Sequence, residues 1–285
     1  MRGAIQLVTA TLLYGVIGIF ARTVGLTIPI FYQNITRSLA TVIILLVIVT
    51  VRHAWKPLAA KDIPVFLIRA VAGVTAFLAY FYTILKVPFG TSYFLFYAGS
   101  VLSGYILGHY WYDERLTKIK IVSLGLAIVG LLLIYQINAG TISPFYFALA
   151  VFTGVSTAVW DVISKKISGT YDTSYITWWD ETLALGMYLV ASFVAREQWT
   201  MPAVTLPWAA SFGIGIVFVA TGMLMVNGFK YIEAQIGSII MLAEILFAIF
   251  FAWLFYGETI TLMTMLGGSL IVAAIVLPEI YAKSR

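Results

Sequence analysis

The stretch KYIEAQIGSIIMLAEILFAIFFAWLFYGETIT, residues 230–261, decides the fold, because residues 86–117 repeat it in altered form as KVPFGTSYFLFYAGSVLSGYILGHYWYDERLT. A constant offset of 144 residues separates the two copies and places Glu114 over Glu258. Each copy is a long apolar run that ends in a short polar turn. We infer that one half of the chain is a copy of the other.

The composition is that of an integral membrane protein. Hydrophobic residues make up 62% of the chain, charged residues only 10%, and the mean hydropathy is +1.00, which leaves too little polar surface to enclose a soluble globule. A spanning helix needs about 20 mainly apolar residues, and β-barrel strands would alternate between faces instead. We therefore predict an all-α polytopic membrane protein with ten transmembrane helices, at 3–22, 29–51, 63–84, 89–111, 119–137, 143–164, 174–195, 208–229, 234–256 and 261–281.

The basic residues are distributed unequally between alternate loops. One side has only Arg22, Lys86 and Arg196; the other has Arg2, Arg52, Lys56, Lys61, Arg69, Arg115, Lys118, Lys120, Lys165, Lys166, Lys230, Lys283 and Arg285. The positive-inside rule then places both termini in the cytoplasm, in a multi-pass protein of the cytoplasmic membrane. Each half has five helices, an odd number, so the repeats 1–141 and 142–285 are expected to be inverted. No cleavable signal peptide is expected, because the first apolar segment has spanning length.

The residue content argues against thiol and metal chemistry, ATP hydrolysis and nucleic-acid binding. The chain has no cysteine, and His53 and His109 lack the spacing of a metal site. No GxxxxGK[ST] phosphate-binding loop occurs, so ATP is not expected to drive the protein directly. The basic charge follows the loops, as membrane topology requires, and does not indicate a nucleic-acid partner. We expect no cofactor and no nucleic-acid partner.

The two polar turns carry a resemblance to a known family. Ten helices in two halves, with YDERLT and YGETIT after the fourth and ninth, resemble the drug/metabolite transporter (DMT) superfamily, and its EamA-like branch in particular. That family has a Gly-Glu turn, a hydroxyl residue and a glycine-rich helix in each half. The second half matches with Gly257, Glu258, Thr261, Gly267 and Gly268.

The first half departs from this pattern in one place. Asp113 stands where the family has glycine before Glu114, while Gly125 and Gly130 keep the small residues of the following helix. The resemblance implies a carrier of amino acids, other metabolites, sugars, nucleotides or organic cations. Inverted repeats suit alternating access to a central site, and no filter segment of a channel is present. One chain can form the whole pathway, so a monomer is sufficient, and a dimer is compatible with the sequence.

Arg37 is the first candidate binding residue, because a charge at membrane depth is costly. Gln33 and Thr41 lie one turn away on the same face, with Asn34 and Ser38 beside them. A guanidinium fits a substrate carboxylate or phosphate. Alternatively, Arg37 pairs with an acid between two helices or extends to the interface.

The repeat offset gives Arg37 an acidic counterpart, Glu181, which follows Asp180 and two tryptophans. Inversion would place Arg37 and Glu181 on opposite sides of the pseudo-axis, so we do not require them to touch. Negative charge also suits a helix N-terminus. The favoured interpretation of Asp180 and Glu181 is therefore a pair of residues at a helix entrance, and that of Trp178 and Trp179 is an interfacial belt.

Glu244 is the most informative single residue, since it lies mid-helix with no basic residue within one turn. Its counterpart at the offset is Ser100, which shares a stripe with Tyr97 and Gly104. Met241, Glu244 and Ala248 form the corresponding stripe, and both stripes are expected to line the centre. Glu244 is a candidate for binding a proton or a cationic group; the structural alternative is an acid hydrogen-bonded across helices.

Asp161 is a secondary candidate beside Trp160. Thr157 lies one turn earlier, and Lys165 one turn later, where an i, i+4 salt bridge is the simpler interpretation. Tyr14, Tyr80, Tyr97 and Trp160 are expected to form cavity walls. An aromatic box around a carboxylate would favour cations.

These features predict a carrier and leave alternatives for its cargo. The leading prediction is a secondary transporter of a small polar metabolite, most simply an amino acid or related zwitterion, working in the lipid bilayer by alternating access. The alternative is a proton-coupled exporter of organic cations or quaternary amines. A membrane enzyme or scaffold is less favoured, because no nucleophile-base cluster is apparent.

Overall fold

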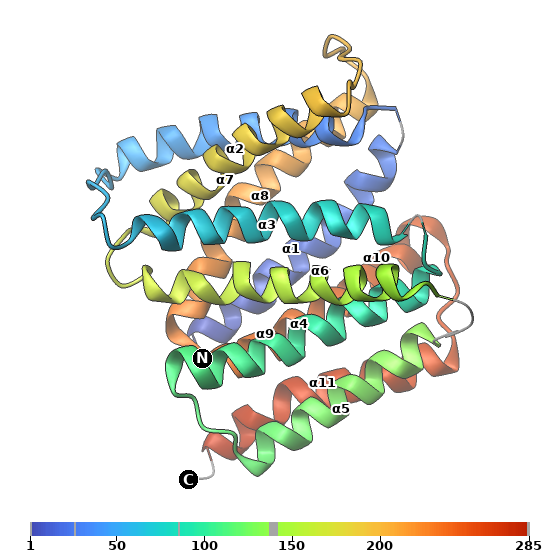
Figure 1. Ribbon diagram of the computed structural model, residues 1–285. Coiled ribbons are helices and arrows are strands. Elements are labelled where there is room, and N and C mark those ends of the chain that lie inside the picture. Colours follow the sequence, from blue (N-terminus) through green and yellow to red (C-terminus); the bar gives the residue numbers. More distant parts are fainter. Residues whose placement is uncertain (1, 26, 85, 137–141, 284–285) are drawn as a thin grey trace.

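The computed structural model describes residues 2–25, 27–84, 86–136 and 142–283, and these form a bundle of long helices (Figure 1). The helices are α1 (Arg2–Val24), α2 (Ile30–Val51), α3 (Ile63–Ile84), α4 (Phe89–Tyr112), α5 (Lys118–Tyr135), α6 (Pro144–Ile163), η1 (Ser164–Lys166), α7 (Thr173–Val194), α8 (Leu206–Tyr231), α9 (Ala234–Met241), α10 (Ala243–Tyr256) and α11 (Leu262–Lys283). Residue 137, the boundary at 141 and Arg285 lie outside the described residues.

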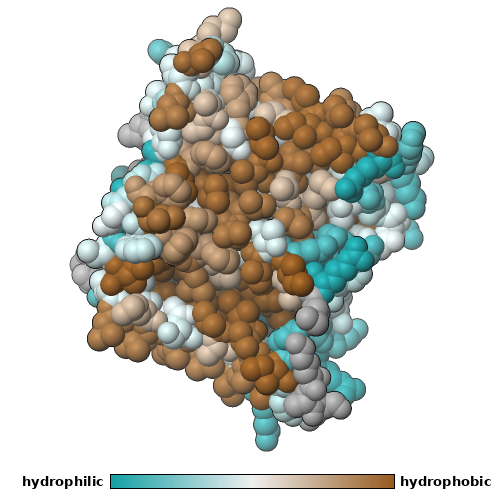
Figure 2. Space-filling model, turned by 180° about the vertical axis from the view of Figure 1, so that it is seen from behind, coloured by the Kyte–Doolittle hydropathy of each residue, from teal (hydrophilic) through white to brown (hydrophobic). Residues whose placement is uncertain are grey.

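Apolar composition makes most of these helices suited to lipid. Within the described residues, eight segments are long and apolar enough to cross a membrane, with α9 and α10 forming one of them. Helices α4 and α7 have spanning length but more polar sequences; α7 carries Asp180 and Glu181. Figure 2 shows one broad face covered mainly by hydrophobic side chains, with hydrophilic residues gathered at its edges. The prediction of an all-α polytopic membrane protein is confirmed.

Helix packing leaves a central group and an edge pair. Helix α1 packs along α8, α2 along α7, and α6 along both α3 and α4. Helices α5 and α11 pack against each other and lie together at one edge of the bundle (Figure 1). The N-terminus and the end of α11 lie at the same end of the bundle (Figure 1).

The ninth predicted span, 234–256, is not one uninterrupted helix. It is divided at Leu242, where the Leu242 N–H donates to the oxygen of Ile239 and the Ile245 N–H donates to that of Leu242. These bonds span three residues, so the α-helix tightens into a 3₁₀ turn at this point. Glu244 therefore lies in the first turn of α10.

The two polar turns have the same backbone geometry. Asp113 ends α4 in the left-handed conformation with φ 53°, and Gly257 ends α10 there with φ 64°. Thr117 then accepts a hydrogen bond from the Lys120 N–H, as Thr261 does from the Thr264 N–H. Aspartate is among the few residues that adopt the left-handed conformation at modest cost, so the missing glycine at 113 leaves the turn intact.

Helices α4 and α6 approach closely because Gly154 has no side chain. A Cβ at Gly154 would lie 2.2 Å from the oxygen of Phe96 and 2.6 Å from the nitrogen of Ser100. Both atoms belong to the backbone of α4, so neither can rotate away. The helices themselves would have to separate.

Gly154→Ala is therefore expected to lower the free energy of unfolding by about 1–3 kcal/mol, the usual range for overpacking. Gly186→Ala is the matched control, because a Cβ there meets nothing within 4 Å and alanine favours the helix. Thermal unfolding of the purified proteins in detergent measures both. Equal stability of the two variants would show that α4 and α6 do not rely on this contact.

Candidate functional site

A cavity of about 380 Å³ lies among the central helices. Its walls come from α1–α4 and α6–α10, and among the residues that line it are seven of the ten predicted site residues: Tyr14, Arg37, Tyr80, Tyr97, Trp160, Asp161 and Glu244. The close packing of the inner helices thus brings together residues that are far apart in sequence. Their role in binding substrate stays a prediction.

Arg37 projects from α2 and forms an ion pair with Glu181 of α7. Its Nη1 lies 3.2 Å from Oε1 and 3.4 Å from Oε2 of Glu181, and the Ser38 hydroxyl donates to Oε2 at 2.7 Å. Both partners are buried. The guanidinium also lies over the ring of Phe218, 3.9 Å from its centroid. The two residues touch because α2 and α7 pack side by side, which agrees with the alternative that Arg37 pairs with an acid between two helices.

A second buried ion pair lies next to the first. Arg69 of α3 is 1% exposed, and its Nη2 lies 3.3 Å from Oδ2 of Asp180. Trp160 Nε1 donates to the same Oδ2 at 2.7 Å, and the Trp160 carbonyl accepts from Arg69 Nη1. Asp180 and Glu181 are thus buried inside α7, and the prediction of a helix entrance is wrong.

The sequence interpretation missed Arg69 by assigning it to a basic loop. Helix α3 begins at Ile63, so Arg69 lies almost two turns inside the helix. That depth was visible in the predicted span 63–84 and could have identified the residue.

Asp161 and Glu244 line the cavity without a close basic partner. Within the described residues no ion pair reaches either carboxylate, and Oδ1 of Asp161 has no hydrogen-bond partner. The expected Asp161–Lys165 pair does not form. Helix α6 ends at Ile163 and continues as the turn η1, so Lys165 is directed elsewhere and contacts Glu114 at 2.9 Å.

Aromatic rings form the wall beside Glu244. The carboxylate lies next to the hydroxyl of Tyr97, and Tyr80, Tyr93 and Phe96 also line the cavity. The hydroxyls of Tyr80 and Tyr93 are hydrogen-bonded to each other. Aromatic faces beside a carboxylate attract cations.

Three predicted residues do not reach the cavity wall. Asn34 accepts from Arg37 Nε at 3.3 Å and donates to the oxygen of Ile30, so it positions the arginine. Gln33 lies on the same helix outside the lining. The backbone nitrogen of Ser100 lies close to Gly154 of α6. Ser100 is absent from the lining of this cavity, and its role in binding stays a prediction.

Acidic residues outnumber basic residues around the cavity. Two arginines, Arg37 and Arg69, are paired with Glu181 and Asp180, which leaves the carboxyl groups of Asp161 and Glu244 as an excess of two acids. Within the described residues no group of three or more histidines, cysteines or acids has the geometry to hold a metal ion.

Known proteins resemble the chain along most of its length. It is 24% identical over 280 residues to the pseudopaline exporter CntI of Pseudomonas aeruginosa, covering 95% of this chain and 94% of that one. It is 27% identical over 180 residues to the uncharacterized transporter YoaV of Bacillus subtilis, covering 60% of each. One crystal structure aligns with 99% of this chain and 98% of its own, with a TM-score of 0.83 and 16% identity, which shows a shared fold.

The helical bundle, its central cavity with buried charged residues and these relatives define a multi-pass membrane transporter. The sequence profile of the EamA-like transporter family matches residues 1–136 and 144–278. The chain belongs to the EamA-like transporter family, and the resemblance to the DMT superfamily is confirmed.

Proposed function

We propose that this protein is a secondary transporter that moves a small organic solute with a protonated amine across the cytoplasmic membrane by alternating access. The observation that carries the proposal is the pair of carboxyl groups, Asp161 and Glu244, that line one cavity and form no ion pair within the described residues. Ionisable groups at membrane depth are rare and mark substrate or ion pathways. In this proposal Glu244 and the aromatic wall bind the amine.

The leading cargo is an amino acid or related zwitterion. Arg37 and Glu244 line the same cavity but have different neighbours: Arg37 lies with Tyr188 and Phe218, and Glu244 lies with Tyr97. One wall then offers a guanidinium to a carboxylate, and the other offers a carboxyl group to an amine. The similarity to an exporter favours outward movement of the cargo.

An organic cation, exchanged for protons, is the second candidate. It is favoured by the excess of two carboxyl groups and by the pairing of both arginines, Arg37 and Arg69, with acids. A zwitterion adds no net charge, whereas a cation or a proton would offset part of the excess.

The repeated turns support two inverted five-helix halves. The left-handed residues Asp113 and Gly257 lie at opposite ends of the bundle, because α4 ends near Ile232, close to the N-terminus, whereas Gly257 adjoins the α1 end at Arg22. The positive-inside rule places the end with both termini in the cytoplasm. One chain is sufficient for the pathway.

The two cargoes are distinguished by a double variant, Arg37→Gln with Glu181→Gln, which leaves no unpaired buried charge. If the cargo is a zwitterion, the variant is expected to lose about 10- to 100-fold in apparent affinity, because one charge-assisted interaction is removed. If the cargo is an organic cation, affinity is expected to be unchanged. Ligand-induced thermal stabilisation across amino acids and quaternary amines measures this, and flux into proteoliposomes confirms transport. If proteoliposomes transported neither amino acids nor quaternary amines, the proposal would be contradicted.

A further inference from the structure

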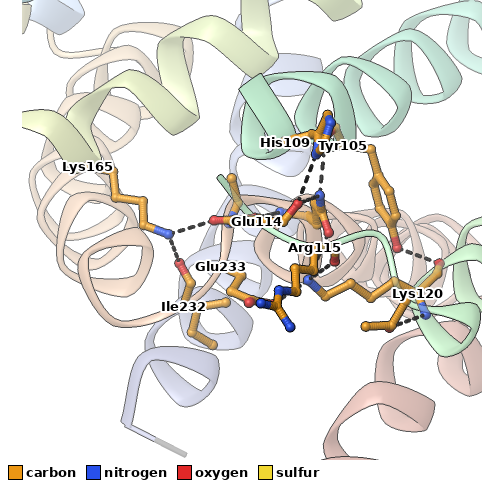
Figure 3. A network of polar contacts seen from close by, with 11 residues as sticks. Tyr105, His109, Glu114, Arg115, Lys120, Lys165, Ile232 and Glu233 are labelled. Atoms are coloured by element: carbon orange, nitrogen blue, oxygen red, sulfur yellow. Dashed lines mark hydrogen bonds and ion pairs between the residues drawn. The ribbon is translucent and has the colours of Figure 1, made fainter. Parts of the chain in front are cut away.

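One polar cluster outside the cavity joins the two halves of the chain. Figure 3 shows Glu114, in the turn after α4, between Lys165 of η1 and the start of α9. Lys165 Nζ lies 2.9 Å from Oε1 of Glu114, and the backbone N–H groups of Ala234 and Gln235 donate to its two carboxylate oxygens at 2.7 and 3.1 Å. The first repeat thus holds the second at the end where both termini lie.

Glu114 is buried, and its carboxylate is fully engaged by the start of α9 and by Lys165. The residue is only 5% exposed, and it satisfies two N–H groups that a helix start leaves without intrahelical partners. Gly108 leaves room for it, since a Cβ there would lie 2.6 Å from Oε2 of Glu114. Charge-assisted hydrogen bonds in such surroundings are the stronger kind.

Its repeat counterpart, Glu258, has the same turn but different surroundings. Its side chain is 52% exposed, and its one ion pair within the described residues joins it to Arg22, which is 56% exposed, at 2.5 Å. An exposed pair of this kind stabilises little. Two equivalent turns are therefore in two different states: Glu114 is buried against η1 and α9, whereas Glu258 has only an exposed contact with Arg22 of α1.

We propose that Glu114 and Glu258 are alternating latches of the two gates, an inference that rests on the proposed carrier function. In the structure, the Glu114 latch closes the cytoplasmic gate and the Glu258 latch is released, so this is the outward-facing state. When the carrier turns over, Glu114 leaves α9. Glu258 then contacts the start of α4, where the 144-residue offset places Gly90 and Thr91 opposite Ala234 and Gln235.

The basic partners of the two glutamates lie one position apart in the repeat, since Glu114 pairs with Lys165 and Glu258 pairs with Arg22. Lys165 and Lys166 flank the Glu114 latch, and Arg22 corresponds to Lys166 at the offset. Arg22 already contacts Glu258, so the second latch is partly assembled. In the inward-facing state, Arg22 remains with Glu258 as the turn approaches α4.

A single cysteine reports the open side of the cavity, because the chain contains no cysteine of its own. Gly18 lines the cavity, and a Cβ there meets nothing within 4 Å. Gly18→Cys is to be labelled with a membrane-impermeant maleimide from the outside and, in inverted vesicles, from the cytoplasmic side. The measurement requires no substrate.

Glu114→Gln is expected to lower the outside labelling rate about tenfold and to raise labelling from the cytoplasmic side, because hydrogen bonds to a charged group are lost and the equilibrium shifts. Glu258→Gln is expected to act in the opposite direction. Asp113→Asn, which removes the adjacent exposed charge and keeps a residue suited to the left-handed conformation, is expected to change neither rate.

Labelling of Glu114→Gln that equals that of Asp113→Asn would overturn the latch, and a shift of both glutamates in one direction would overturn the alternation. Should Glu114→Gln not fold, Lys165→Met removes the same ion pair and is expected to give the same shift. A labelling response without flux of amines would keep the latch and reject the cargo. Flux of amines without a labelling response would keep the cargo and reject the latch.

Discussion

Glu244→Gln is expected to reduce substrate flux about 10- to 100-fold while the protein remains folded and inserted. Glutamine keeps the shape of the side chain and removes its charge, so the loss corresponds to one charge-assisted interaction with the amine or the proton. No close basic residue depends on Glu244 within the described part of the chain, so the change leaves no unpaired cation behind. Initial rates of uptake into proteoliposomes measure the effect.

Ser100→Ala provides the matched control for this prediction. Ser100 occupies the equivalent position in the other repeat, but it does not line the cavity. Its variant is expected to transport normally. If Glu244→Gln transported as fast as Ser100→Ala, Glu244 would not contact the cargo, and the carboxyl group of Asp161 would be the remaining candidate.

Arg69→Met is expected to lower the free energy of unfolding by about 3–5 kcal/mol, because it leaves Asp180 buried without its cation. Arg69 is 1% exposed and Asp180 is 6% exposed, so water cannot replace the lost interaction. Thermal or denaturant unfolding of the purified protein, followed by tryptophan fluorescence, measures the change.

The double variant Arg69→Met with Asp180→Asn separates the buried charge from the loss of packing. Asparagine retains an oxygen for Trp160 Nε1 and carries no charge, so most of the stability is expected to return. Arg22→Met, which breaks the exposed pair with Glu258, is expected to cost less than about 1 kcal/mol. An equal loss in Arg22→Met and Arg69→Met would show that burial does not determine the cost.

The fold was largely predictable, because hydropathy reports each span independently of its neighbours. The predicted ranges agree with the helices to within a few residues. The division at Leu242 was not predictable from the same signal, since the sequence SIIMLAEIL has no glycine or proline to mark it. Hydropathy is insensitive to a change from α-helical to 3₁₀ hydrogen bonds.

The site was predictable as a set of residues but not as a set of contacts. Arg37 and Glu244 were identified from their cost at membrane depth, and both line the cavity. Their partners depend on which helices are adjacent. The Arg37–Glu181 pair follows from the packing of α2 on α7, and the absent Asp161–Lys165 pair follows from the end of α6 at Ile163. Neither packing nor helix ends can be read from a single sequence.

The interruption at Leu242 divides one membrane span into two helices, of which α9 contacts Glu114 and α10 carries Glu244. The first N–H groups of helix α9 donate to Glu114, and Glu244 lies in the first turn of α10. A solute that moves Glu244 therefore acts on the same segment that the latch restrains, with a single joint between them. Linkage is reciprocal. If closure of the cytoplasmic gate raises the affinity for the solute by some factor, the bound solute shifts the equilibrium for gate closure by the same factor. Under the proposed latch mechanism, occupancy of the cavity and closure of the gate are one coupled equilibrium.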